Sequence, residues 1–334
     1  MIVIGASAGG VQAIRAIVAD LPIDLDAAIF IVLHIGAHHS DLPWLLNRAG
    51  ALHACHPENG ELIQAGHIYV APPDHHMVVD AGVINLTKGP RENWARPAID
   101  PLFRSAARAY GSAVIGVVLT GGLNDGTAGM IEIVANGGIT VVQDPDEAAA
   151  PDMPQSVLDN VEVDHVVSVN EIGALLTRLV RQTGAASPSL DHPVGDSQES
   201  GMTGEFTLNQ PVAITCPDCG GALRRSELGT LTQFSCHIGH VYTAEVMLAA
   251  QFLQMERALE AALRSLGERA DLCRQMSAKV IARTDNSESP ALWNAALQEA
   301  VDRTEPLREL LTAAWIHPRS SICGSDRHSG KTSP

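Results

Sequence analysis

Met1-Ile-Val-Ile-Gly-Ala-Ser-Ala-Gly-Gly10 is the stretch of sequence that decides the fold. A β-branched apolar run stops at Gly5, and residues 11–18 then place apolar side chains at helical spacing. The pattern predicts a strand, a turn and a helix, with Ser7 in the turn. Because the first amides of a helix have no partner within the helix, they would point toward Ser7. The turn therefore suits either a serine nucleophile beside an oxyanion site or one wall of a phosphate cradle.

The same alternation of strand and helix continues through the first half of the chain. Apolar runs typical of buried strands end in polar or glycine-rich turns, and segments with helical spacing lie between them. The expected strands cover 27–33, 66–72, 113–120, 138–143 and 164–168; the expected helices cover 41–48 and 101–110, with others after Asp125 and from Met153. Residues 86–97 read as a loop. The alternation predicts an α/β fold with a doubly wound, mostly parallel sheet.

Three polar residues fall at the carboxyl ends of expected parallel strands, where α/β sheets gather ligands and chemistry. Ser7 follows the first strand, His34 follows the second, and Asp125 lies in the glycine-rich turn after residues 113–120. A serine hydroxyl needs an imidazole to accept its proton, and the imidazole needs a carboxylate to fix its tautomer. The placement indicates a Ser-His-Asp triad, although this chain order differs from that of the α/β-hydrolases.

Blander interpretations stay open for each member of this set. The serine and the aspartate could each cap the helix that follows them. His38 and His39 compete with the histidine, and Asp100 and Asp144 are further carboxylates at possible strand or helix boundaries. A nucleotide-binding protein is another possibility for the first turn, but no acidic residue after the first helix reads as a ribose ligand.

Composition narrows the class of protein. A chain of 334 residues, 46% of them hydrophobic, can bury one sizeable core and one small one. The net charge of −16 and the pI near 5.2 disfavour nucleic-acid binding, because such a surface repels phosphate backbones. The apolar start lacks a basic flank and no later run is long enough to span a bilayer. We therefore expect a cytoplasmic protein that does not insert into membranes.

Residues 1 to about 182 resemble the catalytic domain of the chemotaxis protein-glutamate methylesterases (CheB). The match extends over the whole of this part as a series of ordered motifs. They are Gly-Ala-Ser-x-Gly-Gly at 5–10, Val-Leu-His at 32–34, Gly-His-Ile-Tyr-Val-Ala-Pro-Pro-Asp at 66–74, Arg-Pro-Ala-Ile-Asp-Pro-Leu-Phe-Arg-Ser-Ala-Ala at 96–107, Ile-Gly-Val-Val-Leu-Thr-Gly at 115–121, Asn-Asp-Gly-Thr-Ala-Gly at 124–129 and Met-Pro-Gln-Ser at 153–156.

The resemblance implies a serine hydrolase with no cofactor for catalysis. Ser7 would be the nucleophile, His34 the general base and Asp125 its orienting acid, while backbone amides near Ala8 and Gly122 would receive the oxyanion. The implied reaction is hydrolysis of a γ-glutamyl methyl ester in a methylated chemoreceptor, giving glutamate and methanol. Deamidation of glutamine is the related second activity.

Two departures from the family pattern bear on this expectation. Members often carry Thr after the serine and Met after Thr-Gly in the aspartate loop, whereas this chain has Ala8 and Gly122. Backbone amides do not depend on those side chains, but pocket shape and substrate preference do. The usual member also has a phosphorylatable receiver domain before the catalytic domain, and this chain starts directly at the catalytic strand. Control by aspartyl phosphorylation in cis is therefore not expected.

The second half of the chain predicts a metal-binding module. Residues 183–210 are rich in Ser, Gly, Pro and acidic residues and read as a flexible linker. Residues 211–242 then read as a zinc-ribbon-like module, similar to the extension that follows some methylesterase-type domains. Its thiols and imidazole have the spacing of a closed, structural zinc site. The expected ligands are Cys216, Cys219, Cys236 and His240, with His237 as a rival fourth ligand and a redox dithiol as the alternative use of the first pair.

Residues 243–316 have helical spacing throughout, interrupted at 285–290, and predict an antiparallel helical hairpin. Its apolar stripes could bury each other or dock a partner helix. Residues 317–334 read as a disordered tail. The leading hypothesis is an esterase that carries a zinc-stabilised module. The alternative is a catalytically silent scaffolding or ligand-binding member that acts through its zinc-ribbon and helical module.

Overall fold

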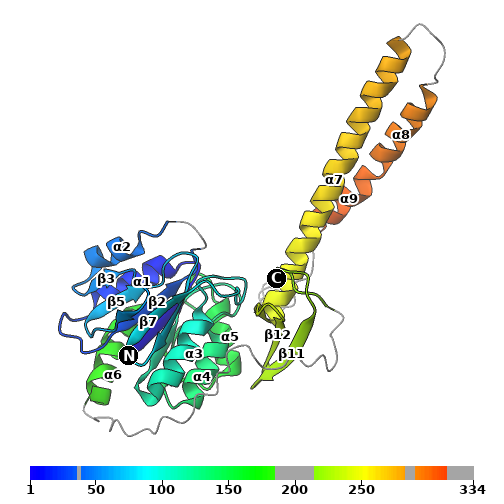
Figure 1. Ribbon diagram of the computed structural model, residues 1–334. Helices are drawn as coiled ribbons and strands as arrows, with labels where there is room; N and C mark the ends of the chain where they lie inside the picture. The colour runs from blue at the N-terminus through cyan, green and yellow to red at the C-terminus, as the bar shows by residue number, and fades with distance from the viewer. Residues whose placement is uncertain (36–38, 185–213, 283–289, 314–334) are drawn as a thin grey trace, which may run out of the picture. The chain divides into compact units, whose positions relative to one another are not determined.

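The apolar run at the start of the chain forms β1 (Ile2–Ala6), which lies at the centre of the main sheet with all five residues buried. The computed structural model describes residues 1–35, 39–184, 214–282 and 290–313, and the chain divides into two compact units, residues 1–250 and 251–334 (Figure 1).

The main sheet has seven strands in the order β10-β9-β8-β1-β2-β5-β3, and every neighbouring pair is parallel. The strands after β1 are β2 (Ile29–Leu33), β3 (His53–Cys55), β5 (His67–Val70), β8 (Ile115–Val118), β9 (Ile139–Gln143) and β10 (His165–Val167).

Helices cover both faces of this sheet, so the predicted doubly wound α/β fold is confirmed (Figure 1). One face carries α1 (Gly10–Ala19), α2 (Leu42–Ala49) and α6 (Val169–Gly184), and the other carries α3 (Ile99–Tyr110), α4 (Thr127–Ala135) and α5 (Asp152–Asn160). A short 3-10 turn, η1 (Gly111–Ala113), joins α3 to β8. Each face buries its own hydrophobic cluster. The sheet therefore fixes the carboxyl ends of β1, β2 and β8 beside one another.

A second sheet was not expected from the sequence. It is antiparallel, in the order β4-β7-β6, with β4 (Glu61–Leu62), β6 (His76–Asp80) and β7 (Val83–Thr87). Gly82, with φ of 82°, makes the tight turn between β6 and β7. The loop predicted at 86–97 therefore begins only after Thr87. The three-residue strand β3 was also missed, because His53-Ala-Cys has no apolar run to mark it.

The cysteine-rich segment folds as a small antiparallel sheet of β11 (Leu223–Leu228), β12 (Leu231–Cys236) and β13 (Val241–Thr243). We call residues 214–243 the ribbon. The ribbon and the main sheet belong to the same compact unit. Strand β13 leads directly into the helix that follows. The helical segment was predicted to begin at residue 243, but this residue is the last of β13 and the helix begins at Ala244.

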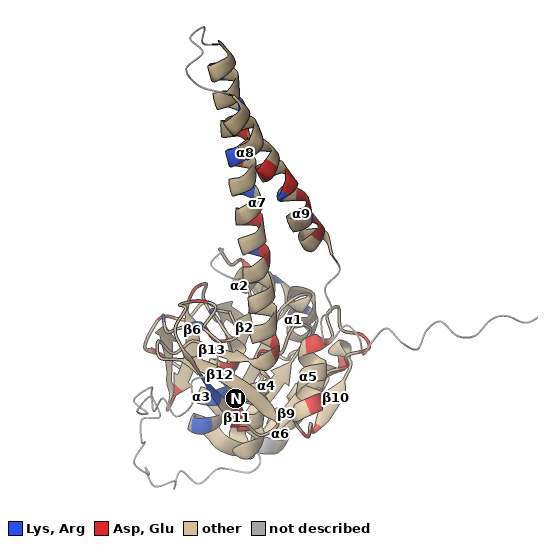
Figure 2. Cartoon of the chain, turned by 90° about the vertical axis from the view of Figure 1, so that its right-hand side faces the viewer, with Lys and Arg blue, Asp and Glu red and all other residues tan. Residues whose placement is uncertain are grey.

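The helical segment consists of α7 (Ala244–Ala282), α8 (Ala291–Asp302) and α9 (Thr304–Thr312). The sequence predicted one continuous helix after the interruption at 285–290, but the chain breaks at Arg303. Pro306 explains the break, because it has no amide hydrogen to donate to the carbonyl of Asp302. Acidic residues occur on all three helices, and basic residues occur on α7 and α9 (Figure 2). Ser277 Oγ of α7 donates to Asn294 Oδ1 of α8 at 2.7 Å.

Several predicted boundaries fall on residues outside the described part of the chain. The predicted linker 183–210 overlaps the end of α6 at 183–184, and its remaining residues lie outside the described ranges. The same holds for most of the predicted break at 285–290, for the start of the module at 211 and for the predicted tail 317–334. Within the described ranges, none of the helices combines the length and the apolar character that crossing a membrane requires.

Candidate active site

Ser7 lies in the turn between β1 and α1, and its backbone fixes it there. Its amide donates to Thr120 O at 2.9 Å, and its carbonyl accepts from Gly10 N at 2.9 Å. The residue at the start of α1 is Gly9, in the left-handed region, and no side chain caps the helix. The half-buried Ser7 hydroxyl forms no hydrogen bond with any described residue. The serine therefore does not act as a helix cap.

Gly121 brings the loop after β8 against Ser7. A Cβ on Gly121 would lie 2.8 Å from Ser7 Cβ and 2.0 Å from Met153 Sδ, so only glycine allows this close approach. The carbonyl and amide of Gly121 are bonded to Met153 N and Ala150 O, both at 2.9 Å. The loop that contains the candidate aspartate is thus held in contact with the candidate serine.

His34 reaches the same place from the neighbouring strand. Ala6 and Leu33 are paired in the parallel register of β1 and β2, and His34 N donates to Ala6 O at 3.2 Å. Because neighbouring strands lie about 4.8 Å apart, Ser7 and His34 leave the sheet side by side. His34 Nε2 lies 2.8 Å from Asp125 Oδ2. Of the rival histidines, His39 is exposed and pairs with Asp41, and His38 lies outside the described residues.

The Asp125 carboxylate is buried and surrounded by donors. Oδ2 accepts from Ile99 N at 2.6 Å as well as from His34, and Oδ1 accepts from Asp100 N at 3.3 Å and Gly126 N at 3.0 Å. Two of these amides are the first of α3, whose free N–H groups favour a negative charge. Burial by itself would raise the pKa of Asp125, but the hydrogen bond and charge of His34 and the backbone donors lower the pKa to about 2. The carboxylate is therefore ionised at neutral pH.

The other two carboxylates considered from the sequence have different partners. Asp100 Oδ1 accepts from Gly126 N at 3.0 Å and from Gly129 N at 2.7 Å, at the start of α4. Burial and the nearby charge of Asp125 raise the pKa of Asp100. Asp144 Oδ1 accepts from Asp146 N at 2.9 Å in an exposed turn. Among the three, only Asp125 contacts His34.

Asn93 is a site residue that the sequence analysis missed. Its Nδ2 donates to Asp125 Oδ1 at 2.9 Å and to Asp100 Oδ2 at 2.8 Å. One amide group therefore bridges the two buried carboxylates. Asp100 belongs to the Arg-Pro-Ala-Ile-Asp motif at 96–100, which could have drawn attention to it. Asn93 lies in no motif, and only the tertiary structure brings it to the site.

The two amides expected to form an oxyanion site lie on the loops that meet at Ser7. Neither Ala8 N nor Gly122 N donates a hydrogen bond to any described residue. The carbonyl of Ala8 accepts from Thr120 Oγ1 at 2.8 Å, which orients the next peptide group, between Ala8 and Gly9. Both amides are therefore free to donate to a bound group.

A cavity of about 340 Å³ opens beside His34. Its lining includes Asn93, Trp94 and the exposed Arg91, together with an ion pair of 2.6 Å between Arg96 and Asp74. The hydrogen bond from Arg96 lowers the pKa of Asp74.

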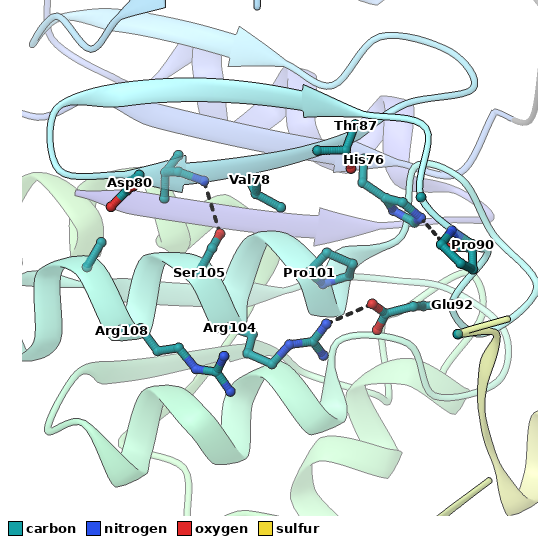
Figure 3. A pocket seen from close by; sticks show the side chains of 14 residues that line it. His76, Val78, Asp80, Thr87, Pro90, Glu92, Pro101, Arg104, Ser105 and Arg108 are labelled. Carbon is teal, nitrogen blue, oxygen red and sulfur yellow. Dashed lines mark hydrogen bonds and ion pairs between the residues drawn. The ribbon is translucent and has the colours of Figure 1, made fainter. Parts of the chain in front are cut away.

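A larger cavity of about 530 Å³ lies between β6, β7 and α3 and contains none of the three candidate catalytic residues. Figure 3 shows Arg104 and Glu92 pointing toward each other across it, at 2.7 Å. His76 Nε2 bonds to Pro90 O at 2.9 Å beside them, and burial lowers the pKa of His76. Because Arg104 and Glu92 are paired with each other, we assign no chemistry to this cavity.

The ribbon gathers a group of cysteine and histidine side chains. The ligand atoms of Cys216, Cys219, Cys236 and His240 all lie within 4.8 Å of one another. The sulfurs of Cys219 and Cys236 are 3.7 Å apart, and His240 Nδ1 lies 3.6 Å and 3.5 Å from the sulfurs of Cys216 and Cys236. A tetrahedral zinc with bonds of about 2.3 Å to sulfur and about 2.0 Å to nitrogen requires separations of about 3.8 Å and 3.5 Å. The residues therefore fit zinc.

The surroundings of His240 fit the same use. Its second ring nitrogen, Nε2, lies 3.9 Å from Asp218 Oδ2, which is longer than a hydrogen bond but places a carboxylate near the imidazole, as in many metal sites. Asp218 also accepts a hydrogen bond of 2.8 Å from Tyr242. The rival ligand His237 instead lies over Gly221, where a Cβ would approach its ring to 2.6 Å. His240, and not His237, is the imidazole in the group.

Comparison with known proteins identifies the family of residues 2–176, which match the family model described as CheB methylesterase. A relative from Leptospira interrogans is 41% identical over 181 residues, which are 53% of this chain and 93% of the relative. A relative from Anaeromyxobacter dehalogenans, named protein-glutamate methylesterase/protein-glutamine glutaminase 2, is 37% identical over 182 residues, 54% of this chain and 53% of the relative.

A solved structure agrees with the sequence comparisons. The crystal structure of the Thermotoga maritima CheB methylesterase catalytic domain superposes with a TM-score of 0.51 at 32% identity, covering 53% of this chain and 97% of that one. The match of fold and sequence extends over the domain that holds Ser7, His34 and Asp125. The chain belongs to the CheB methylesterase family.

Proposed function

We propose that the chain hydrolyses γ-glutamyl methyl esters of a chemoreceptor-type protein, with Ser7 as nucleophile, His34 as general base and Asp125 as the acid that orients His34. The observation that carries the proposal is the 2.8 Å hydrogen bond between His34 Nε2 and Asp125 Oδ2, at the sheet edge where Ser7 follows β1. With Nε2 committed to Asp125, Nδ1 is the ring nitrogen left to take a proton.

The reaction follows from these roles. Ser7 Oγ attacks the ester carbonyl carbon while His34 accepts the hydroxyl proton, and the carbonyl oxygen becomes an oxyanion. The free amides of Ala8 and Gly122 are the donors we assign to it. The C–O bond to the methoxide then breaks, and His34 returns the proton, so that methanol leaves. Water attacks the acyl-enzyme by the same route and releases glutamate. A glutamine side chain would form the same acyl-enzyme and release ammonia.

The test is methanol release from a methylated chemoreceptor fragment incubated with the full chain. We expect methanol to be released at a rate proportional to the enzyme concentration. After rapid acid quenching, we also expect the peptide that contains Ser7 to increase in mass. The mass increase identifies the nucleophile, since it reports the covalent intermediate itself. Absence of both methanol and acylated peptide would favour the alternative, a scaffolding member without catalysis. Docking of a partner helix on 243–316 remains a prediction.

We also propose that the ribbon binds one structural zinc through its three cysteines and His240. Four protein ligands leave no open position, so the ion would stabilise the ribbon without entering the reaction. The fit of the ligand separations to a tetrahedral ion supports this proposal.

Replacing the buried Cys216 with serine is expected to lower zinc affinity at least about 100-fold, because one thiolate of the set is lost. Metal analysis of the purified protein after dialysis against a weak chelator should then find well under one zinc per chain, against one for the unaltered protein. Cys55→Ser is the matched control, because Cys55 lies on β3 outside the group. Equal zinc content in Cys216→Ser and Cys55→Ser would contradict the ligand assignment.

A further inference from the structure

The last strand of the ribbon contacts the loop that holds Asn93. Val241 N donates to Arg91 O at 3.3 Å, and Asn93 N donates to Val241 O at 2.8 Å, so this segment pairs with β13 as a parallel strand would. Thr243 N also donates to Asn93 Oδ1 at 3.2 Å. The side-chain amide of Asn93 is thus bonded to the ribbon through its oxygen and to Asp125 through its nitrogen.

Two residues of that segment, Thr243 and Glu245, bond to the residue that precedes the same aspartate in the chain. Thr243 Oγ1 donates to Asn124 Oδ1 at 2.6 Å, and Asn124 Nδ2 donates to Glu245 at 2.7 Å. Asn124 is fully buried and directly precedes Asp125 in the chain. Residues 243–245 therefore bond to Asn124, which precedes Asp125 in the chain, and to Asn93, which is hydrogen-bonded to Asp125.

The two loops that contact the ribbon also contain most of the non-glycine residues with an unfavourable, left-handed backbone. Among the described residues, four other than glycine have positive φ, and three of them, Asn93, Trp94 and Leu123, lie in these two loops. A left-handed backbone is unfavourable for residues with a Cβ, so such loops need support from outside. Trp94 and Leu123 pack against the hydrophobic cluster that the ribbon forms with the start of α7, which includes Tyr242 and Val246.

We infer that the ribbon is a brace for the catalytic site, and that Asn93 is a positioning residue which transmits the docking of β13 to the Asp125–His34 pair. This inference rests on the proposed esterase function. The brace acts through two bonded routes, Thr243 to Asn93 to Asp125 and Thr243 to Asn124. Docking of β13 keeps the left-handed residues of the Asn93 loop and the Leu123 loop in place. The Asp125 carboxylate then faces His34 in a single orientation.

Two substitutions test the brace without changing a triad residue. Thr243→Val keeps the shape of the side chain and removes the hydroxyl that bonds Asn124, and Asn93→Ala removes the bridge to Asp125. We expect kcat to fall about 3-fold to 10-fold for Thr243→Val, which loses two buried hydrogen bonds, and about 10-fold to 100-fold for Asn93→Ala, which loses three, with KM unchanged in both. Thr243→Ser, which keeps the hydroxyl, should retain the rate of the unaltered protein.

A second readout needs no substrate. The His34 ring proton shared with Asp125 should give a downfield proton resonance, which shifts or broadens in Thr243→Val and Asn93→Ala. Thr232→Val is the matched control on the same ribbon, because Thr232 bonds only the exposed Glu227, at 2.8 Å, among the described residues. It should leave both kcat and the resonance unchanged.

The two readouts separate failure of the brace from failure of the esterase function. If the unaltered protein releases no methanol, the proposed function fails, and the resonance still decides the brace. Thr243→Val breaks the route through Asn124, because its backbone amide keeps the bond to Asn93, and Asn93→Ala breaks the other route. If both variants kept their zinc, their kcat and their His34 resonance, the inference would be overturned. Should Asn93→Ala not fold, the comparison of Thr243→Val with Thr243→Ser decides the brace through the Asn124 route.

Discussion

Ser7→Ala is expected to lower kcat for methyl ester hydrolysis by at least about 10⁴-fold, because no covalent intermediate can form without the hydroxyl. What remains would come from substrate binding and from the oxyanion donors. The measurement is methanol release under saturating substrate, with the acylated peptide followed by mass spectrometry. Both signals should disappear together.

The fold of this variant should be intact. The turn at Ser7 is held by its backbone bonds to Thr120 and Gly10, and its hydroxyl has no partner among the described residues. Its loss should change the free energy of unfolding by less than about 0.5 kcal/mol. Ser112→Ala is the matched control, since Ser112 is exposed in η1. A near-normal rate in Ser7→Ala, with Ser112→Ala also active, would refute the nucleophile assignment.

Asp125→Asn is the second large effect, with an expected loss of about 10³-fold to 10⁴-fold in kcat. Both oxygens of Asp125 face donors: Oδ2 accepts from Ile99 N and His34, and Oδ1 accepts from Asn93 and Gly126 N. An asparagine amide must point its NH₂ at one of these sets. Turned toward His34, it would force the wrong imidazole tautomer and leave Ile99 N without an acceptor.

The same argument gives a cost in stability of about 1–3 kcal/mol for the buried donor left unpaired. Chemical denaturation measures that cost and steady-state kinetics measures kcat. Asp144→Asn is the matched control, because Asp144 also follows a strand of the main sheet but only accepts from Asp146 N. If both asparagine variants kept the rate of the unaltered protein, Asp125 would have no role in orienting His34.

Local patterns in the sequence predict most of the main sheet. The strands β1, β2, β8 and β9 are apolar runs buried on both faces, which periodicity detects. The strands β3, β4, β6 and β7 escaped detection, because none of them is a continuous apolar run buried on both faces. The break at Arg303 was also missed, although Pro306 marks it in the sequence.

The candidate site divides in the same way. Ser7 and His34 could be placed together from the sequence, because each follows a strand of a parallel sheet and neighbouring strands end at one edge. Asn93 could not be found, since its role depends on a hydrogen bond to Thr243, 150 residues away.

The sequence by itself determined the parallel sheet, the residue types at its carboxyl edge and the four residues that we propose as metal ligands, because strand period and motif spacing are local properties. Only the tertiary structure decided which carboxylate meets His34. Asp125 lies beside His34 because the first amides of α3 donate hydrogen bonds to its carboxylate there. The Asp100 carboxylate instead accepts from an amide at the start of α4. The tertiary structure also brought β13 against Asn93, since hydrogen bonds between distant segments form only when the two surfaces pack together.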